Sequence, residues 1–274
     1  MIKSALTRTT IYILLSIGAI LMLLPFVWMI STSLKTPNEV MTMPPVWIPS
    51  ELNWSNFTDA LSVAPFDRYF VNSLVVTVLS TIGELITTIL AAYAFARINF
   101  YGKEIVFAVL LGTMMVPGEV LLIPNFVTLS NLGWIDTYQA LIIPWIASVF
   151  AIFLLRQFFL GIPKELSYAA KVDGCSEFRF LWYVMVPLAK PALITVALLK
   201  VINSWNAFLW PLIVTNSQEL RTLPVGLSAF TTEAGVKYEL LMAASSMVVI
   251  PMIILFFIMQ KYIIAGVART GLKG

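Results

Sequence analysis

Two charged side chains, Glu84 and Lys200, lie inside long apolar stretches of the sequence. Ionisable groups are costly in such surroundings unless they are paired or hydrated. At 1.5 Å of rise per helical residue, both lie at a similar depth, roughly 20 Å below the outer face of a membrane. Two interpretations are open: an ion pair that ties the two stretches together, or two separate hydrated groups.

Three further side chains with polar groups share the apolar stretch of Lys200. Asn203, Asn206 and Trp210 are spaced as i, i+3 and i+7, which places them on one face of a continuous helix. Amides can hydrogen-bond sugar hydroxyls, and an indole ring can stack on the C–H face of a sugar. The alternative is polar contact between helices, worth roughly 1 kcal/mol per contact. We expect this face to line a cavity.

The short stretch YAAKVDG, residues 168–174, lies between two apolar runs and carries charge. Ala169 and Ala170 have almost no side chain, so another protein could approach this face closely, and Gly174 permits a sharp turn. Charged neighbours could fix the register of such a contact: Lys164, Glu165, Lys171 and Asp173. The stretch is either a docking site for a partner or an ordinary helix at the membrane surface.

Several kinds of chemistry are excluded by what the sequence lacks. It has no histidine and a single cysteine, Cys175, which rules out histidine-based metal sites, triads and an intrachain disulfide. No Gly-x-x-x-x-Gly-Lys-Ser/Thr motif occurs, so we expect neither an ATP site nor a metal in this chain. A membrane enzyme would need a convergent catalytic set, for which the candidates are few.

The elements that carry these residues are membrane spans. The chain is 59% hydrophobic and 11% charged, against about 25% charged in an ordinary soluble domain. A membrane-spanning helix needs about 20 mostly apolar residues, and six stretches qualify: 11–31, 69–96, 105–124, 137–155, 192–214 and 240–260. We therefore expect an all-α membrane protein with six transmembrane helices. Five prolines inside these stretches mark kinks or breaks: Pro25, Pro117, Pro144, Pro211 and Pro251.

The distribution of basic residues predicts the orientation. With the N-terminus inside, twelve lysines and arginines lie on the inner side and four on the outer side, with Lys200 left inside a span. Inner loops of membrane proteins are enriched in these residues, so both termini should be cytoplasmic. The outer segments 35–68 and 215–239 are then long enough to present a surface. The longest inner segment, 156–190, should hold one helix ending near Val172 and a second ending near Pro187.

Four separate stretches carry a family resemblance. Residues 162–193, IPKELSYAAKVDGCSEFRFLWYVMVPLAKPAL, resemble the EAA loop of binding-protein-dependent ABC importer permeases, in which Glu-Ala-Ala is followed by a glycine and later a proline. The stretches AAYAFARINFYGK, NSWNAFLWPL and GVARTGLKG resemble the carbohydrate branch, in particular the second permease of maltose and glycerol-phosphate systems. The resemblance covers nearly the whole chain and implies a type I ABC importer permease fold.

The resemblance also implies site residues. The EAA loop would dock in a cleft of a separate ATPase subunit through coupling residues at matching positions: Glu165, Tyr168, Ala169, Ala170, Asp173 and Gly174. Tyr168 replaces the family glutamate, which puts an ion pair with the ATPase in doubt. The C-terminal tail would reach the interface of two ATPase subunits through Arg269, Gly271 and Lys273. The translocation path would comprise Glu84, Lys200, Asn203, Asn206 and Trp210.

We therefore expect a non-enzymatic permease subunit in a bacterial-type cytoplasmic membrane, forming half of the path for a sugar or polyol phosphate. Its partners would be a second permease, two ATPase subunits that bind ATP and Mg²⁺, an extracytoplasmic binding protein and lipid, but no nucleic acid. The predicted parts are 1–68, a core of 69–264 with the inner loop 156–190, and a tail of 265–274. The alternative is an ion-coupled secondary transporter, which would need carboxylates near the midplane such as Glu84.

Overall fold

The structure, a computed structural model, describes residues 2–232 and 235–270. These residues form helices and loops, apart from one short antiparallel pair, β1 (Thr231–Thr232) with β2 (Gly235–Val236). They fall into two compact units. The first holds the described residues of Met1–Phe66 and Gly226–Ile253, and the second those of Asp67–Val225 and Ile254–Gly274. The predicted domain boundaries after residues 68 and 264 stay predictions.

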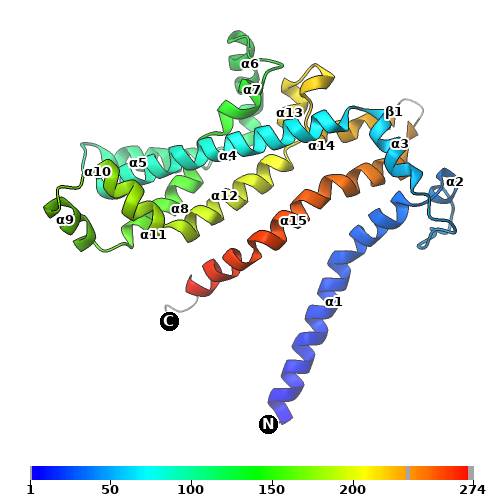
Figure 1. The fold of residues 1–274 in the computed structure, drawn as a ribbon, viewed down its shortest axis with the longest axis horizontal. Helices are drawn as coiled ribbons and strands as arrows, with labels where there is room; N and C mark the ends of the chain where they lie inside the picture. Colours follow the sequence, from blue (N-terminus) through cyan, green and yellow to red (C-terminus); the bar gives the residue numbers. More distant parts are fainter. Residues whose placement is uncertain (1, 233–234, 271–274) are drawn as a thin grey trace. The chain divides into compact units, whose positions relative to one another are not determined.

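Three helices are long and apolar enough to cross a membrane. They are α1 (Ile2–Ser33), α4 (Phe66–Arg97) and α15 (Tyr238–Thr270), drawn in blue, cyan and orange in Figure 1. They correspond to the first, second and sixth predicted spans. Pro25 and Pro251 lie inside α1 and α15 without breaking them.

Three further candidate spans are bent helix pairs. The first joins α5 (Lys103–Thr113) to η1 (Gly118–Leu121) and α6 (Leu122–Asn131), with a bend of 92°. The second joins α7 (Tyr138–Ile142) and η2 (Ile143–Trp145) to α8 (Val149–Leu160), with a bend of 41°. The third joins α10 (Glu177–Phe180), η3 (Leu181–Met185) and α11 (Val186–Leu188) to α12 (Lys190–Trp205), with a bend of 79°. If each bent pair counts as one span, the structure has up to six spans, which agrees with the predicted all-α protein with six transmembrane helices.

The fifth predicted span, 192–214, is not one helix. Helix α12 ends at Trp205, and α13 (Leu209–Val214) follows after a short break. Pro211 explains the interruption, because its ring clashes with the carbonyl of Ala207 in a continuous helix and it offers no N–H. The Asn206 side chain instead donates a hydrogen bond to the Ile202 carbonyl at 2.9 Å. The prediction that Asn203, Asn206 and Trp210 share one helix face was therefore wrong.

The first unit contains the outer segment that follows α1. Its short helices are α2 (Pro37–Val40) and α3 (Ser55–Val63), and the Asn56 amide on α3 donates to the carbonyls of Ser33 and Lys35 at 2.9 and 2.8 Å. Glu39 accepts hydrogen bonds from Ser50 and Thr36, which lower the pKa of its carboxyl to about 2. The outer segment 35–68 is therefore ordered by short helices and by hydrogen bonds of its own.

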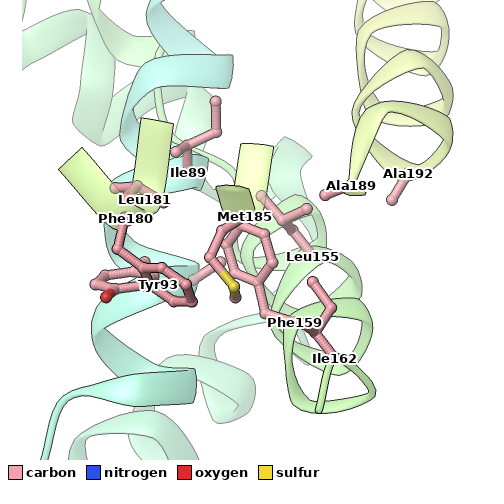
Figure 2. Packing of buried hydrophobic residues seen from close by; sticks show 11 residues of the cluster. Ile89, Tyr93, Leu155, Phe159, Ile162, Phe180, Leu181, Met185, Ala189 and Ala192 are labelled. Atoms are coloured by element: carbon pink, nitrogen blue, oxygen red, sulfur yellow. The ribbon is translucent and has the colours of Figure 1, made fainter. Parts of the chain in front are cut away.

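The second unit is built around α4. Helix α8 contacts both α5 and α12, and side chains of α4, α8 and the α10–α12 segment form its largest buried cluster (Figure 2). In this cluster, the ring of Tyr93 on α4 lies edge to face with the ring of Phe159 on α8, and the side chain of Met185 is fully buried. The rest of the unit comprises α9 (Glu165–Val172), η4 (Gln218–Leu220) and most of α14 (Leu223–Gly226); η5 (Leu227–Phe230) belongs to the first unit.

Candidate functional site

The inner loop forms the predicted helix, turn and helix. Helix α9 ends at Val172, and the backbone N–H groups of Asp173 and Cys175 bond the carbonyls of Ala169 and Ala170 at 3.0 and 2.8 Å. Gly174 adopts a φ of 70°, the left-handed region that glycine enters without steric cost. The hydroxyl of Ser176 then accepts the Arg179 N–H at 3.4 Å and starts the next helix. In Figure 1, α9 lies beyond the end of α4.

The two alanines of this loop have different surroundings. Ala169 is exposed, whereas Ala170 packs against the buried cluster of Figure 2. Tyr168, at the position of the family glutamate, is 62% exposed, and Val172 on the same helix is 88% exposed. The face available to a partner therefore includes the exposed Tyr168, Ala169 and Val172, while Ala170 belongs to the internal packing.

One carboxylate joins the loop to α4. Glu177 pairs with Lys171 at 3.0 Å and accepts a hydrogen bond from the hydroxyl of Tyr93. Lys171 is thus engaged within the chain rather than free to fix the register of a partner.

Two arginines hold α8 where it enters the loop. The guanidinium of Arg97, the last residue of α4, donates to the carbonyls of Phe159 and Ile162 at 2.8 and 2.5 Å. In return, Arg156 on α8 donates to the Phe95 carbonyl at 3.1 Å. Sequence reasoning assigned Arg97 no role, although an arginine in the last turn of a span was a signal that could have suggested one.

A cavity of about 400 Å³ lies within the second unit. Predicted path residues Lys200, Asn203 and Trp210 line it, whereas Asn206 bonds to its own helix. Sequence reasoning missed other residues of the wall: Ser80, Glu119, Trp145, Ser204 and Phe208. Several of them come from helix breaks, which the apolar pattern alone did not locate.

Aromatic rings form one wall of this cavity. Trp145 and Trp210 meet edge to face with ring centroids 5.8 Å apart. The indole N–H of Trp210 donates to the Ala140 carbonyl at 3.0 Å, so it does not point to a solute. Polar groups lie nearby: the hydroxyls of Ser80 and Ser204 are 3.3 Å apart. The arrangement combines stacking surfaces with hydroxyl and amide groups, which suits a polyhydroxylated solute.

Glu84 and Lys200 are paired. Lys200 Nζ lies 3.0 Å from a carboxylate oxygen of Glu84, and their side chains are only 10% and 9% exposed. The same ammonium donates to the Trp145 carbonyl at 2.5 Å. Of the two interpretations of the sequence, the ion pair is confirmed. A second cavity includes both residues in its wall.

The second outer segment is tied to the start of α4 and to the loop before α7. The Asn72 amide donates to the carbonyls of Glu219 and Arg221 at 2.7 and 2.9 Å. The carboxylate of Asp136 accepts the N–H groups of Asn216 and Ser217 at 2.9 and 3.0 Å. This surface is therefore fixed by hydrogen bonds to the helices that enclose the cavity.

Other predicted site residues stay predictions. Gly271 and Lys273 lie outside the described residues, and for Arg269 only the helical backbone is described. Within the described residues, no group of three or more histidine, cysteine, aspartate or glutamate side chains could hold a metal ion.

Comparison with protein families gives a match over most of the chain. The family described as binding-protein-dependent transport system inner membrane component matches residues 85–269. This range includes the last part of α4 from Leu85 onward, the inner loop, and the residues of α12 and α13 that line the cavity.

Similar proteins are known from several organisms. The chain is 37% identical to an arabinooligosaccharides transport system permease protein of Halalkalibacterium halodurans, over 95% of this chain and 96% of that protein. It is 37% identical to a trehalose/maltose transport system permease protein of Thermococcus litoralis, over 96% and 97%. It is 30% identical to an sn-glycerol-3-phosphate transport system permease protein of Agrobacterium fabrum, over 97% of each chain.

A solved structure has the same fold. A chain in the crystal structure of a bacterial ABC transporter involved in the import of the acidic polysaccharide alginate superimposes with a TM-score of 0.85. The sequences are 26% identical, and the match covers 95% of this chain and 97% of that chain.

Proposed function

Because the chain belongs to the family of binding-protein-dependent transport system inner membrane components, we propose that it forms half of the solute path of an ABC importer for a carbohydrate. The arrangement of the second unit carries this proposal. An exposed helix, turn and helix continues directly into α8, and α8 leads back to Trp145 in the cavity wall. A displacement of the inner loop is thereby transmitted to the cavity wall through a single helix, α8.

The solute we propose is a sugar, an oligosaccharide or a polyol phosphate. The relatives named above transport arabinooligosaccharides, trehalose or maltose, and sn-glycerol 3-phosphate. The rings of Trp145 and Trp210, with the polar groups of Ser80, Asn203 and Ser204, support this class. We assign these cavity residues, with the Glu84–Lys200 pair, to the translocation path.

The remaining parts of the importer are separate subunits. Two ATPase subunits would bind ATP and Mg²⁺ and receive the loop at Glu165, Tyr168, Ala169, Asp173 and Gly174, with the tail at Arg269, Gly271 and Lys273. A second permease would complete the cavity, and an extracytoplasmic binding protein would dock on segments 35–68 and 215–239. Closure of the ATPase pair would open the cavity outward, and hydrolysis would reset it, in a cytoplasmic membrane with both termini of this chain inside.

The competing proposal, an ion-coupled secondary transporter, is less well supported. It depends on a carboxylate near the midplane that is free to bind the coupling ion. Glu84 instead engages Lys200 at 3.0 Å. The family match and the exposed loop also favour an ATP-driven importer.

A substitution at Gly174 tests the proposal. A side chain there meets open space, but the φ of 70° is unfavourable for residues other than glycine, by roughly 1–2 kcal/mol. Gly174→Val should disturb the turn and lower solute-stimulated ATP hydrolysis of the assembled importer about five- to thirty-fold. Gly174→Asn is the matched control, because asparagine enters this region readily, and it should retain most activity.

The measurement starts from the tagged chain purified from its own membranes with its accompanying subunits and reconstituted in liposomes. Maltose, arabinotriose and sn-glycerol 3-phosphate serve as probes with the binding protein. A chain that purifies alone and transports without nucleotide would overturn the proposal. Wild-type activity of both Gly174 variants would show that the turn at Gly174 is not needed for coupling.

A further inference from the structure

The break between η2 and α8 leaves two backbone carbonyls without their helical hydrogen-bond donors. Helix η2 ends at Trp145 and α8 begins at Val149, with Ser148 as its N-cap. In a continuous helix, the carbonyls of Trp145 and Ile146 would accept N–H groups four residues later. The break removes these donors, so the two carbonyls need other partners, which side chains or water in the cavity lined by the break can supply.

Side chains from two other helices supply the missing donors. Lys200 of α12 donates to the Trp145 carbonyl, and the hydroxyl of Thr87 on α4 donates to the Ile146 carbonyl, each at 2.5 Å. Glu84, one helical turn before Thr87, balances the charge of Lys200 at 3.0 Å. We call these three side chains, Glu84, Thr87 and Lys200, the break clamp.

The packing of α4 against the break is equally specific. A Cβ atom at Gly83 would lie 2.7 Å from the Cγ2 atom of Ile146, a distance that real contacts do not reach. The glycine therefore allows α4 to approach closely enough for Thr87 to reach the Ile146 carbonyl. Small residues serve the same purpose at contacts between membrane helices in general.

The clamp anchors one end of α8, and Arg97 anchors the other. Arg97 holds the carbonyls of Phe159 and Ile162 where α8 enters the inner loop. Arg156, between the two ends, binds the Phe95 carbonyl of α4. Helix α8 is thus tied to α4 by hydrogen bonds before its start, at Arg156 and at its end, and Trp145, just before the break, places its ring in the cavity wall against Trp210.

We propose that the break clamp is a set of positioning residues that fixes the Trp145 wall of the cavity to α8, so that movement of the inner loop reaches the solute path. Lys200 in this role is a ligand of the protein backbone rather than of the solute. Its charge is retained because an ammonium can serve the carboxylate and the carbonyl at once. The proposal rests on the importer function proposed above, and it adds the physical link between the loop and the cavity.

Thr87 offers the sharpest test, because Thr87→Val removes the hydroxyl and keeps the shape of the side chain. The next residue provides a matched control. Thr88 is fully buried, and among the described residues its hydroxyl has no hydrogen-bond partner, so Thr88→Val removes a hydroxyl that bonds nothing. Both variants and Thr87→Ser are compared in the reconstituted importer, with solute transported per ATP hydrolysed as the readout.

We expect Thr87→Val to assemble and hydrolyse ATP, but to transport at least about five-fold less solute per ATP, because the part-buried Ile146 carbonyl has lost its side-chain donor. Thr87→Ser should restore the ratio, and Thr88→Val should leave it unchanged. A merely structural role would lower the yield of complex without changing this ratio. If the wild type transports with ATP and both valine variants keep its ratio, the clamp proposal is overturned while the importer function stands. If the wild type needs no ATP, the proposed function itself fails.

Discussion

Lys200 shows why a charge can persist deep in an apolar stretch. Its ammonium satisfies the Glu84 carboxylate and the Trp145 carbonyl together. Removing one partner of a buried pair leaves an uncompensated charge, which costs about 3–5 kcal/mol, whereas removing both can be nearly neutral. The carbonyl, however, would lose its donor in either case.

This difference separates the two roles of the lysine. Lys200→Leu should strongly reduce the amount of assembled complex, because Glu84 is left buried and unpaired. The double variant Glu84→Leu/Lys200→Leu should recover most of the assembly but not the transport per ATP, since the Trp145 carbonyl stays without a donor. Complex yield and transport per ATP, measured side by side, check both statements. If the double variant fully recovered both complex yield and transport per ATP, the only role of Lys200 would be to balance the charge of Glu84.

The sequence could predict this pair because depth along a helix follows directly from residue number. Glu84 and Lys200 lie at similar depth in two predicted spans, and the structure joins them. It could not predict that Trp210 leaves the face of Asn203, because that depends on where α12 stops. Trp145 and Thr87 were missed because their contacts are made across the fold, with no local signal in the sequence.

Local signals explain which elements were predicted well. Pro163, Gly174 and Ser176 mark the turn and helix start of the inner loop, and the structure places α9 and α10 accordingly. The apolar runs at 105–124 and 137–155 gave the spans but not their bends of 92° and 41°. Prolines occur at both bends, yet Pro25 and Pro251 lie in unbroken helices. The surrounding packing decides which proline breaks its helix.

Two glycines show how packing separates positions that look alike in sequence. Gly83 lies in α4 against Ile146, whereas a Cβ at Gly112 in α5 would meet nothing within 4 Å. Gly83→Ala should destabilise the protein by about 1–3 kcal/mol, because the added methyl must displace Ile146. Gly112→Ala should stabilise it by up to about 1 kcal/mol, since alanine favours the helix. Thermal unfolding in detergent, followed by tryptophan fluorescence, measures both. Equal shifts for the two variants would show that α4 does not approach the break as closely as described.

Across the chain, the basic residues predict which loops face the cytoplasm. Twelve of them fall in the segments assigned to the inner side, including the loop that carries Lys164, Lys171 and Arg179. This asymmetry orients membrane proteins during insertion. The proposed coupling to a cytoplasmic ATPase requires the same orientation, so one measurement bears on both.

Because the chain has a single cysteine, Cys175, its orientation can be measured by labelling cysteines introduced at chosen positions. In a Cys175→Ser background, cysteines can be introduced at Tyr101, which is fully exposed in the turn after α4, and at Ile48, which is 81% exposed in the outer segment. A membrane-impermeant maleimide should label Ile48→Cys in intact cells and Tyr101→Cys only in inside-out vesicles. Labelling of the wild-type Cys175 should follow that of Tyr101→Cys. The reverse pattern would place the inner loop outside the cell, where no ATPase subunit could reach it, and would overturn both the orientation and the proposed mechanism of coupling.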